Sequence, residues 1–131
     1  MKVLILSLIV ALSSVAFGQQ GSLDVSIEFR GIEEGYDHTT RDELYVDGKL
    51  LLVTEERLES KTIKLNVQVP RGKHTIKIVN WVMYEGVWEE NNVENNYSLD
   101  SFREIECNFR KKGQLTVVYD LNESEVIMKY K

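Results

Sequence analysis

Two histidines, one cysteine and a surplus of carboxylates are the residues of this sequence that could do chemistry. Nucleophilic catalysis needs a nucleophile, a base within hydrogen-bond reach and a third group that orients the base. His38 and His74 have no catalytic motif around them, and nothing near Cys107 would lower the pKa of its thiol. We therefore predict no catalytic residues and expect a protein that is not an enzyme.

A polar segment at residues 36–43 is the best candidate for a metal site. Asp37, His38, Asp42 and Glu43 could present oxygens and one nitrogen to a divalent cation. Their spacing matches neither the ligand order of a calcium loop nor the paired ligands of a zinc site. A small metal-dependent hydrolase built on this segment is therefore the weakest functional alternative.

The stretch at residues 89–96 is rich in glutamate and asparagine and offers a second set of oxygens. Calcium is the cation that such oxygens would suit, although a run of acidic residues is usually a solvated loop. No cofactor is predicted, and calcium is the one alternative.

Four aromatic residues form a candidate binding surface: Trp81, Tyr84, Trp88 and Tyr97. Aromatic rings can stack on the faces of sugars or anchor a protein partner. The alternative is structural, with Trp81 in the core and Trp88 packed against its own loop.

Strict alternation of apolar and polar residues predicts the elements that would position these side chains. The pattern holds at residues 23–29 and 62–69 and opens a long strand at 74–84. Further strands are predicted at residues 102–109, 114–120 and 125–130. Cys107 alternates with Ile105 and Phe109, which indicates a core thiol.

Turn residues separate these strands. Asp47-Gly48 predicts a tight hairpin between residues 43–46 and 49–53, and Pro70 ends the strand before it. Residues 85–100 lack an apolar period and are predicted as a long exposed loop, and residues 50–59 could instead form a helical turn. We predict an all-β fold, an antiparallel β-sandwich of seven or eight strands that is Ig-like or transthyretin-like.

The first 18 residues have the features of a cleavable signal peptide. Lys2 precedes an apolar run at residues 3–10, and Ala16 and Gly18 stand at the minus three and minus one positions. No cysteine lies near the predicted cleavage site, so a lipoprotein is not expected. The sequence thus predicts residues 19–131 as a single domain that is secreted or periplasmic. A single cysteine cannot form a disulfide within the chain, which in an exported protein suggests a bacterial envelope.

The charge balance limits the partners. The chain has 16 basic and 21 acidic residues, and without Lys2 the balance is 15 against 21. An acidic surface disfavours polyanions, so we predict neither nucleic-acid binding nor membrane insertion after signal cleavage. A protein or a surface glycan is the predicted partner, and the oligomeric state stays open.

Two turn motifs resemble those of the PEGA-type module of bacterial surface and envelope proteins. The first is Val46-Asp47-Gly48-Lys49, and the second is the segment 70–74, which reads Pro-Arg-Gly-Lys-His and opens a strand. The chain lacks that family's Ser-Asn-Pro opening and carries a long insertion at residues 85–100. The resemblance implies a small β-sandwich with a structural or adhesive role and no catalytic residues.

The leading functional hypothesis is an exported, non-enzymatic β-sandwich that acts as a binding or structural module through protein or cell-surface contacts. The first alternative is a carbohydrate-binding module that uses the four aromatic residues between positions 81 and 97.

Overall fold

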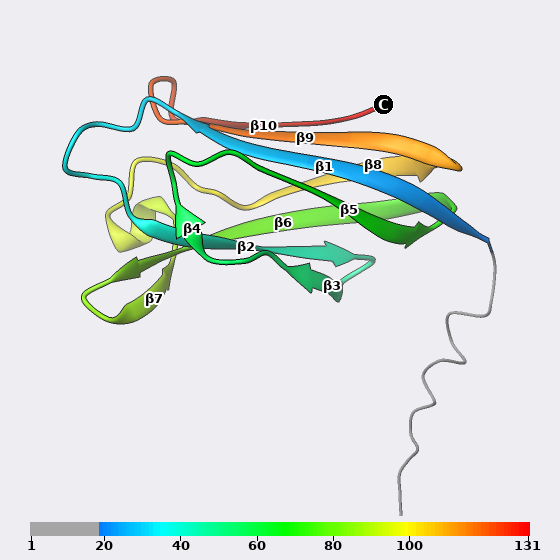
Figure 1. The fold of residues 1–131 in the computed structure, drawn as a ribbon, viewed down its shortest axis with the longest axis horizontal. Coiled ribbons are helices and arrows are strands. Elements are labelled where there is room, and N and C mark those ends of the chain that lie inside the picture. The colour runs from blue at the N-terminus through cyan, green and yellow to red at the C-terminus, as the bar shows by residue number, and fades with distance from the viewer. Residues whose placement is uncertain (1–18) are drawn as a thin grey trace, which may run out of the picture.

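The computed structural model describes residues 19–131, and the predicted signal peptide lies outside the described residues. The described chain folds into two β-sheets packed face to face (Figure 1). The strands are β1 (Gln20–Arg30), β2 (Thr39–Val46), β3 (Lys49–Val53), β4 (Arg57–Leu58), β5 (Ile63–Pro70), β6 (Gly72–Tyr84), β7 (Val87–Glu90), β8 (Arg103–Phe109), β9 (Lys112–Asp120) and β10 (Glu125–Tyr130). The prediction of an all-β sandwich is therefore confirmed.

The first sheet has the strand order β10-β9-β1-β5. Strand β1 pairs antiparallel with β5 and parallel with β9, so the strand that opens the described chain lies inside the sheet. The second sheet is built on β6, which pairs along one side with β2. The other side of β6 is shared between β8 and β7, and β3 and β4 share the free side of β2.

The core between the sheets follows from the alternation in the sequence. The inward residues of β1 and β9 are almost fully buried, as are those of β2 and β6 that face them. The principal members are Leu23, Val25, Ile27, Leu44, Ile76, Ile78, Leu115, Val117 and Phe109. Cys107 is part of this core, as predicted, and burial raises the pKa of its thiol to about 11.

The structure differs from the prediction in two segments. Residues 85–100 are not one exposed loop, because Glu85-Gly86 makes a tight turn with both φ angles positive and β7 returns along β6. A short 3-10 helix, η2 (Val93–Asn95), follows. Most of residues 50–59 lie in β3 and β4 and none forms a helical turn, and residues 19–131 contain ten strands where seven or eight were predicted.

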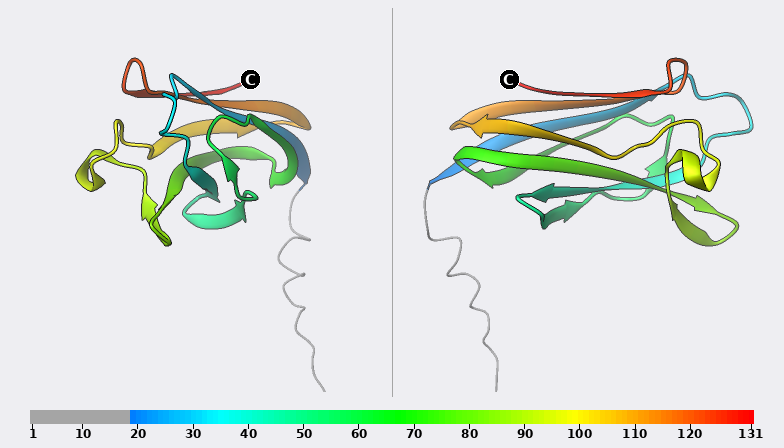
Figure 2. Two further views of the ribbon diagram at one scale, coloured as in Figure 1. Left: turned by 60° about the vertical axis from the view of Figure 1, so that its left-hand side comes forward. Right: turned by 180° about the vertical axis from the view of Figure 1, so that it is seen from behind.

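Four connections meet at one end of the sandwich. They are the β1–β2 loop, the β6–β7 hairpin, the segment from β7 to β8 and the β9–β10 turn, which lie together at the left of Figure 1 and the right of the rear view in Figure 2. We call this end the loop end. None of the helical segments within residues 19–131 is long and apolar enough to cross a membrane.

Candidate binding pocket

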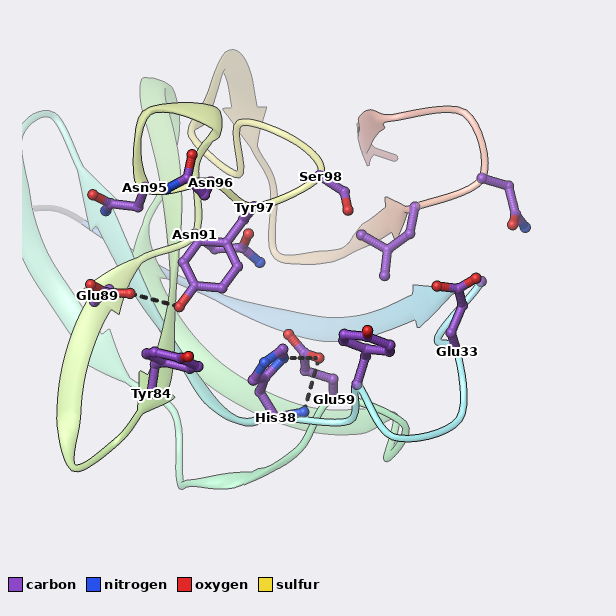
Figure 3. Close-up of a pocket in the computed structure, with 14 residues that line it drawn as sticks. Glu33, His38, Glu59, Tyr84, Glu89, Asn91, Asn95, Asn96, Tyr97 and Ser98 are labelled. Carbon is purple, nitrogen blue, oxygen red and sulfur yellow. Dashed lines mark hydrogen bonds and ion pairs between the residues drawn. The ribbon is translucent and has the colours of Figure 1, made fainter.

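A pocket of about 800 Å3 opens at the loop end (Figure 3). All four connections of that end contribute to its wall, together with Glu59 from the segment between β4 and β5. The lining residues are Gly31, Glu33, Tyr36, His38, Glu59, Tyr84, Glu89, Asn91, Asn95, Asn96, Tyr97, Ser98, Leu121 and Asn122. The set combines three tyrosines, three glutamates and several amides, so it offers ring faces together with hydrogen-bonding groups.

One wall of the pocket is the β1–β2 loop fastened to the segment after β4. The backbone N–H of Glu59 donates to the His38 carbonyl oxygen at 2.9 Å. In return the Glu59 carboxylate lies 3.1 Å from the His38 backbone nitrogen and 3.3 Å from its ring Nδ1. Asp37 adds a second fastening, because its two oxygens accept from the backbone and the hydroxyl of Ser60.

Glu59 is the most buried carboxylate of the pocket wall, with 4% of the residue exposed. Burial raises its pKa, and the hydrogen bonds and charge of His38 oppose that rise. Both contacts with His38 fall on Oε1, whereas Oε2 accepts no hydrogen bond from any residue in the described part of the chain.

The facing wall is held by Tyr97 and the residues around η2. The Tyr97 hydroxyl donates to Glu89 at 2.8 Å, and its ring meets the His38 ring edge-on at 6.0 Å. Burial and the Glu89 carboxylate raise the pKa of Tyr97 well above its usual value. Figure 3 shows Tyr97 on one side of the opening, with Tyr84 and His38 on the other.

The glutamate- and asparagine-rich stretch that suggested calcium uses much of its polar chemistry to build this wall. Asn92 caps η2 by accepting from the Asn95 backbone at 2.8 Å, and the Asn95 amide donates to the Glu90 carbonyl oxygen. The Asp100 carboxylate accepts from the Val93 backbone. These groups therefore hold the loop in shape rather than converging on a common point.

The predicted metal residues are not brought together. Asp42 and Glu43 are neighbours on β2 and point to opposite faces of the sheet, so Asp42 is buried and Glu43 accepts from Trp81 and Tyr45 outside. Asp37 and His38 bind Ser60 and Glu59 in the loop. Among residues 19–131, no three His, Cys, Asp or Glu side chains are grouped so that they could hold a metal ion.

Asp42 instead anchors a buried polar network behind the pocket. It pairs with Arg57 at 2.7 Å and accepts from the Tyr119 hydroxyl and the Asn80 amide, each at 2.9 Å. Asn80 in turn accepts from the side chain of Asn91, which lines the pocket. The pocket is thus supported by polar groups that are already paired with one another.

The four predicted aromatic residues divide between two surfaces. Tyr84 and Tyr97 line the pocket, while Trp81 and Trp88 lie on the outer face of the second sheet. There Trp81 donates to Glu43 at 2.9 Å, and the Arg41 guanidinium lies 4.2 Å from the centre of a Trp88 ring. The alternative that placed Trp81 in the core was wrong, because the alternation of β6 turns Asn80 and Val82 inward and Trp81 outward.

Sequence reasoning missed Tyr36, Glu59 and Asn91 as pocket residues. Each is far in sequence from the others, and each reaches the pocket through a connection whose path depends on strand pairing. The sequence held one weak signal for Tyr36, a large aromatic residue directly after a glycine in a polar loop, where binding residues often lie. In the structure that glycine, Gly35, has a positive φ of 88°.

Comparison with known proteins adds no family. No protein-family model and no curated protein matches the chain. Among solved structures, the chain is similar to a Gram-negative toxin (6% identity, TM-score 0.39) and a trapped toxin (14%, 0.39). It is also similar to a disulfide-locked mutant of intermedilysin solved with human CD59 (8%, 0.37). Each match covers 87% of this chain and less than a quarter of the other protein.

Proposed function

We propose that this protein is an exported, non-enzymatic binding module that recognises a protein or cell-surface ligand through its loop-end pocket. The observation that carries the proposal is the pocket itself, in which four connections place three tyrosines among amide and carboxylate groups. Two sheets form a rigid frame and the connections at one end form the site, which is how β-sandwich modules commonly bind.

Export and the structural role are proposed on the sequence. The apolar run and small residues before Gln19 support a cleavable signal, and hence a secreted or periplasmic location. The two turn motifs that resemble the PEGA-type module lie in contact, because Asp47 binds the His74 ring and the Thr75 backbone.

A surface glycan is the second candidate ligand, and the tyrosines favour it. Tyr36 and Tyr84 are 65% and 52% exposed, which is unusual for such large rings and leaves their faces open to a sugar. The amide side chains of Asn95 and Asn96 border the same pocket and are suited to hydroxyl groups.

The test is a glycan array and a binding assay on envelope preparations, with Tyr84→Ala as the pocket variant. We expect the variant to lose most of the signal, because removing a stacking ring costs about 1 kcal/mol or more. The matched control is Phe102→Ala, which removes an exposed ring that does not line the pocket. Equal loss in both variants, or retained binding by Tyr84→Ala, would exclude the pocket as the site.

A further inference from the structure

We propose that the loop-end pocket binds an alkylammonium group, which the tyrosine rings surround and the glutamates neutralise. This inference rests on the proposed function and names the chemical class of its ligand. Three lines of evidence lead to it: the sign of the charge in the pocket, the state of its aromatic rings and the environment of Glu59.

The charge of the pocket is negative. Its wall includes Glu33, Glu59 and Glu89, and none of its fourteen lining residues is a lysine or an arginine. Neither Glu33 nor Glu89 forms an ion pair within the described part of the chain. An anionic ligand would therefore meet uncompensated repulsion, whereas a cation would meet complementary charge.

The aromatic rings of the pocket lack a cation of their own. On the outer face of the second sheet, Arg41 covers Trp88 and Lys77 lies 4.4 Å from the centre of the Tyr45 ring. No such contact with Tyr36, Tyr84 or Tyr97 is found among residues 19–131. Clusters of open aromatic faces are what proteins use to hold quaternary ammonium groups.

Glu59 supplies the third argument. Its side chain is 95% buried yet lines the pocket, and its Oε2 accepts no hydrogen bond from the described residues. Oε2 is not one of the fully buried side-chain atoms that lack a partner, so this oxygen is accessible from the pocket. An ammonium group there would place a positive charge beside an accessible carboxylate oxygen.

The volume of the pocket defines the rest of the ligand. About 800 Å3 is far more than a trimethylammonium group fills, so the cation would be the head of a larger molecule. The amides of Asn95 and Asn96 and the hydroxyl of Ser98 line the same pocket and suit a polar remainder. Both a choline headgroup and an amino sugar have this build.

The experiment is an NMR titration of the purified protein with choline chloride and with 3,3-dimethyl-1-butanol, its neutral isostere. We expect saturable shifts for the loop-end residues with choline, and a dissociation constant about tenfold higher or more for the isostere. Glucosamine compared with glucose distinguishes an amino sugar from a choline headgroup as the source of the ammonium group.

Two variants test the residues. Tyr84→Ala and Glu89→Gln should each weaken ammonium binding several-fold, because one removes an exposed ring and the other a pocket charge. Phe102→Ala and Glu104→Gln are the matched controls on exposed positions outside the pocket and should bind as the unaltered protein does.

The outcomes separate this inference from the proposed function. Equal affinity for choline and its isostere, or no saturable binding of any ammonium probe, overturns the ammonium assignment. If a neutral glycan then binds and Tyr84→Ala abolishes that binding, the proposed function stands without it. If the protein binds neither an ammonium probe nor a neutral glycan, both the ammonium assignment and the proposed function are overturned.

Discussion

At the scale of single residues, Asp42 is the side chain on which the buried polar network depends. It is fully buried and is the only acidic partner recorded for Arg57 among the described residues. Two guanidinium nitrogens of Arg57, Nε and Nη2, are buried without a hydrogen-bond partner there. We expect Asp42→Ala to lower the free energy of unfolding by about 3–5 kcal/mol, because it leaves a buried cation unpaired. Urea denaturation followed by circular dichroism measures this loss.

The control for this prediction is the double variant Asp42→Ala with Arg57→Met, which removes both charges. It should be more stable than Asp42→Ala alone, since a buried pair replaced by apolar groups costs far less than a broken one. A loss below about 1 kcal/mol in the single variant would show that water compensates Arg57, and would contradict the network described above.

Asp42 also shows which contacts the sequence pattern could not predict. Alternation could place Asp42 and Glu43 on opposite faces of a strand, but it could not find Arg57 fifteen positions later. Arg57 reaches Asp42 through β4, whose two residues are too short to leave a periodic signal. The candidate metal set was assembled from neighbours in sequence, whereas the structure pairs each member with a residue from another segment.

At the scale of elements, the β2–β3 hairpin is tied to the start of β6 by one carboxylate. Asp47 accepts from the Thr75 backbone at 2.9 Å and lies 2.6 Å from the His74 ring. The hydrogen bond from Thr75, and then that of His74, lowers the pKa of Asp47. A depressed pKa means that the carboxylate stabilises the fold above the unfolded pKa of about 3.9, and that this is lost as pH falls through the folded value.

We therefore expect Asp47→Asn to destabilise the protein near pH 6 but not near pH 2. Asparagine tolerates the φ of 51° at this position and keeps an acceptor oxygen, so the substitution isolates the charge. Because the Asp47 side chain is 52% exposed, the effect at pH 6 should be about 0.5–1 kcal/mol. Thermal melts of the variant and of Glu104→Gln across this pH range measure it. A difference that does not change with pH would mean that turn geometry, and not charge, explains the loss.

Turn chemistry explains which elements were predictable. Asp47-Gly48 was recognised, and the structure has the expected two-residue turn with φ angles of 51° and 81°. Glu85-Gly86 has almost the same geometry, with φ angles of 51° and 82°, and was missed. Glutamate rarely adopts positive φ, so its turn lacked the usual signature. Of the three pocket tyrosines, Tyr84 and Tyr97 were in the predicted aromatic set and Tyr36 was not, because Tyr36 lies in the β1–β2 loop, far from them in sequence.

At the scale of the whole molecule, the sandwich has a topology that local signals do not determine. Strand β1 pairs with β9, which lies about ninety residues further along the chain, and this pairing is parallel. The hydrophobic alternation of both strands predicted that they are buried, but it carried no information on which strands are neighbours. The loop-end pocket depends on that pairing, because it brings the β1–β2 loop beside the β9–β10 turn.

This topology also determines how fast the protein can fold. Strand β1 cannot form all its hydrogen bonds through local contacts, because its partner β9 is distant in sequence. The entropy cost of closing that long loop must therefore be met before the β1–β9 contacts stabilise the chain. We expect refolding over about a millisecond to seconds, as in other sandwiches dominated by distant contacts. Stopped-flow fluorescence can follow it through Trp81 and Trp88, and equal rates at several protein concentrations would exclude association. Refolding in microseconds would show that a local hairpin, and not the β1–β9 pairing, limits the rate.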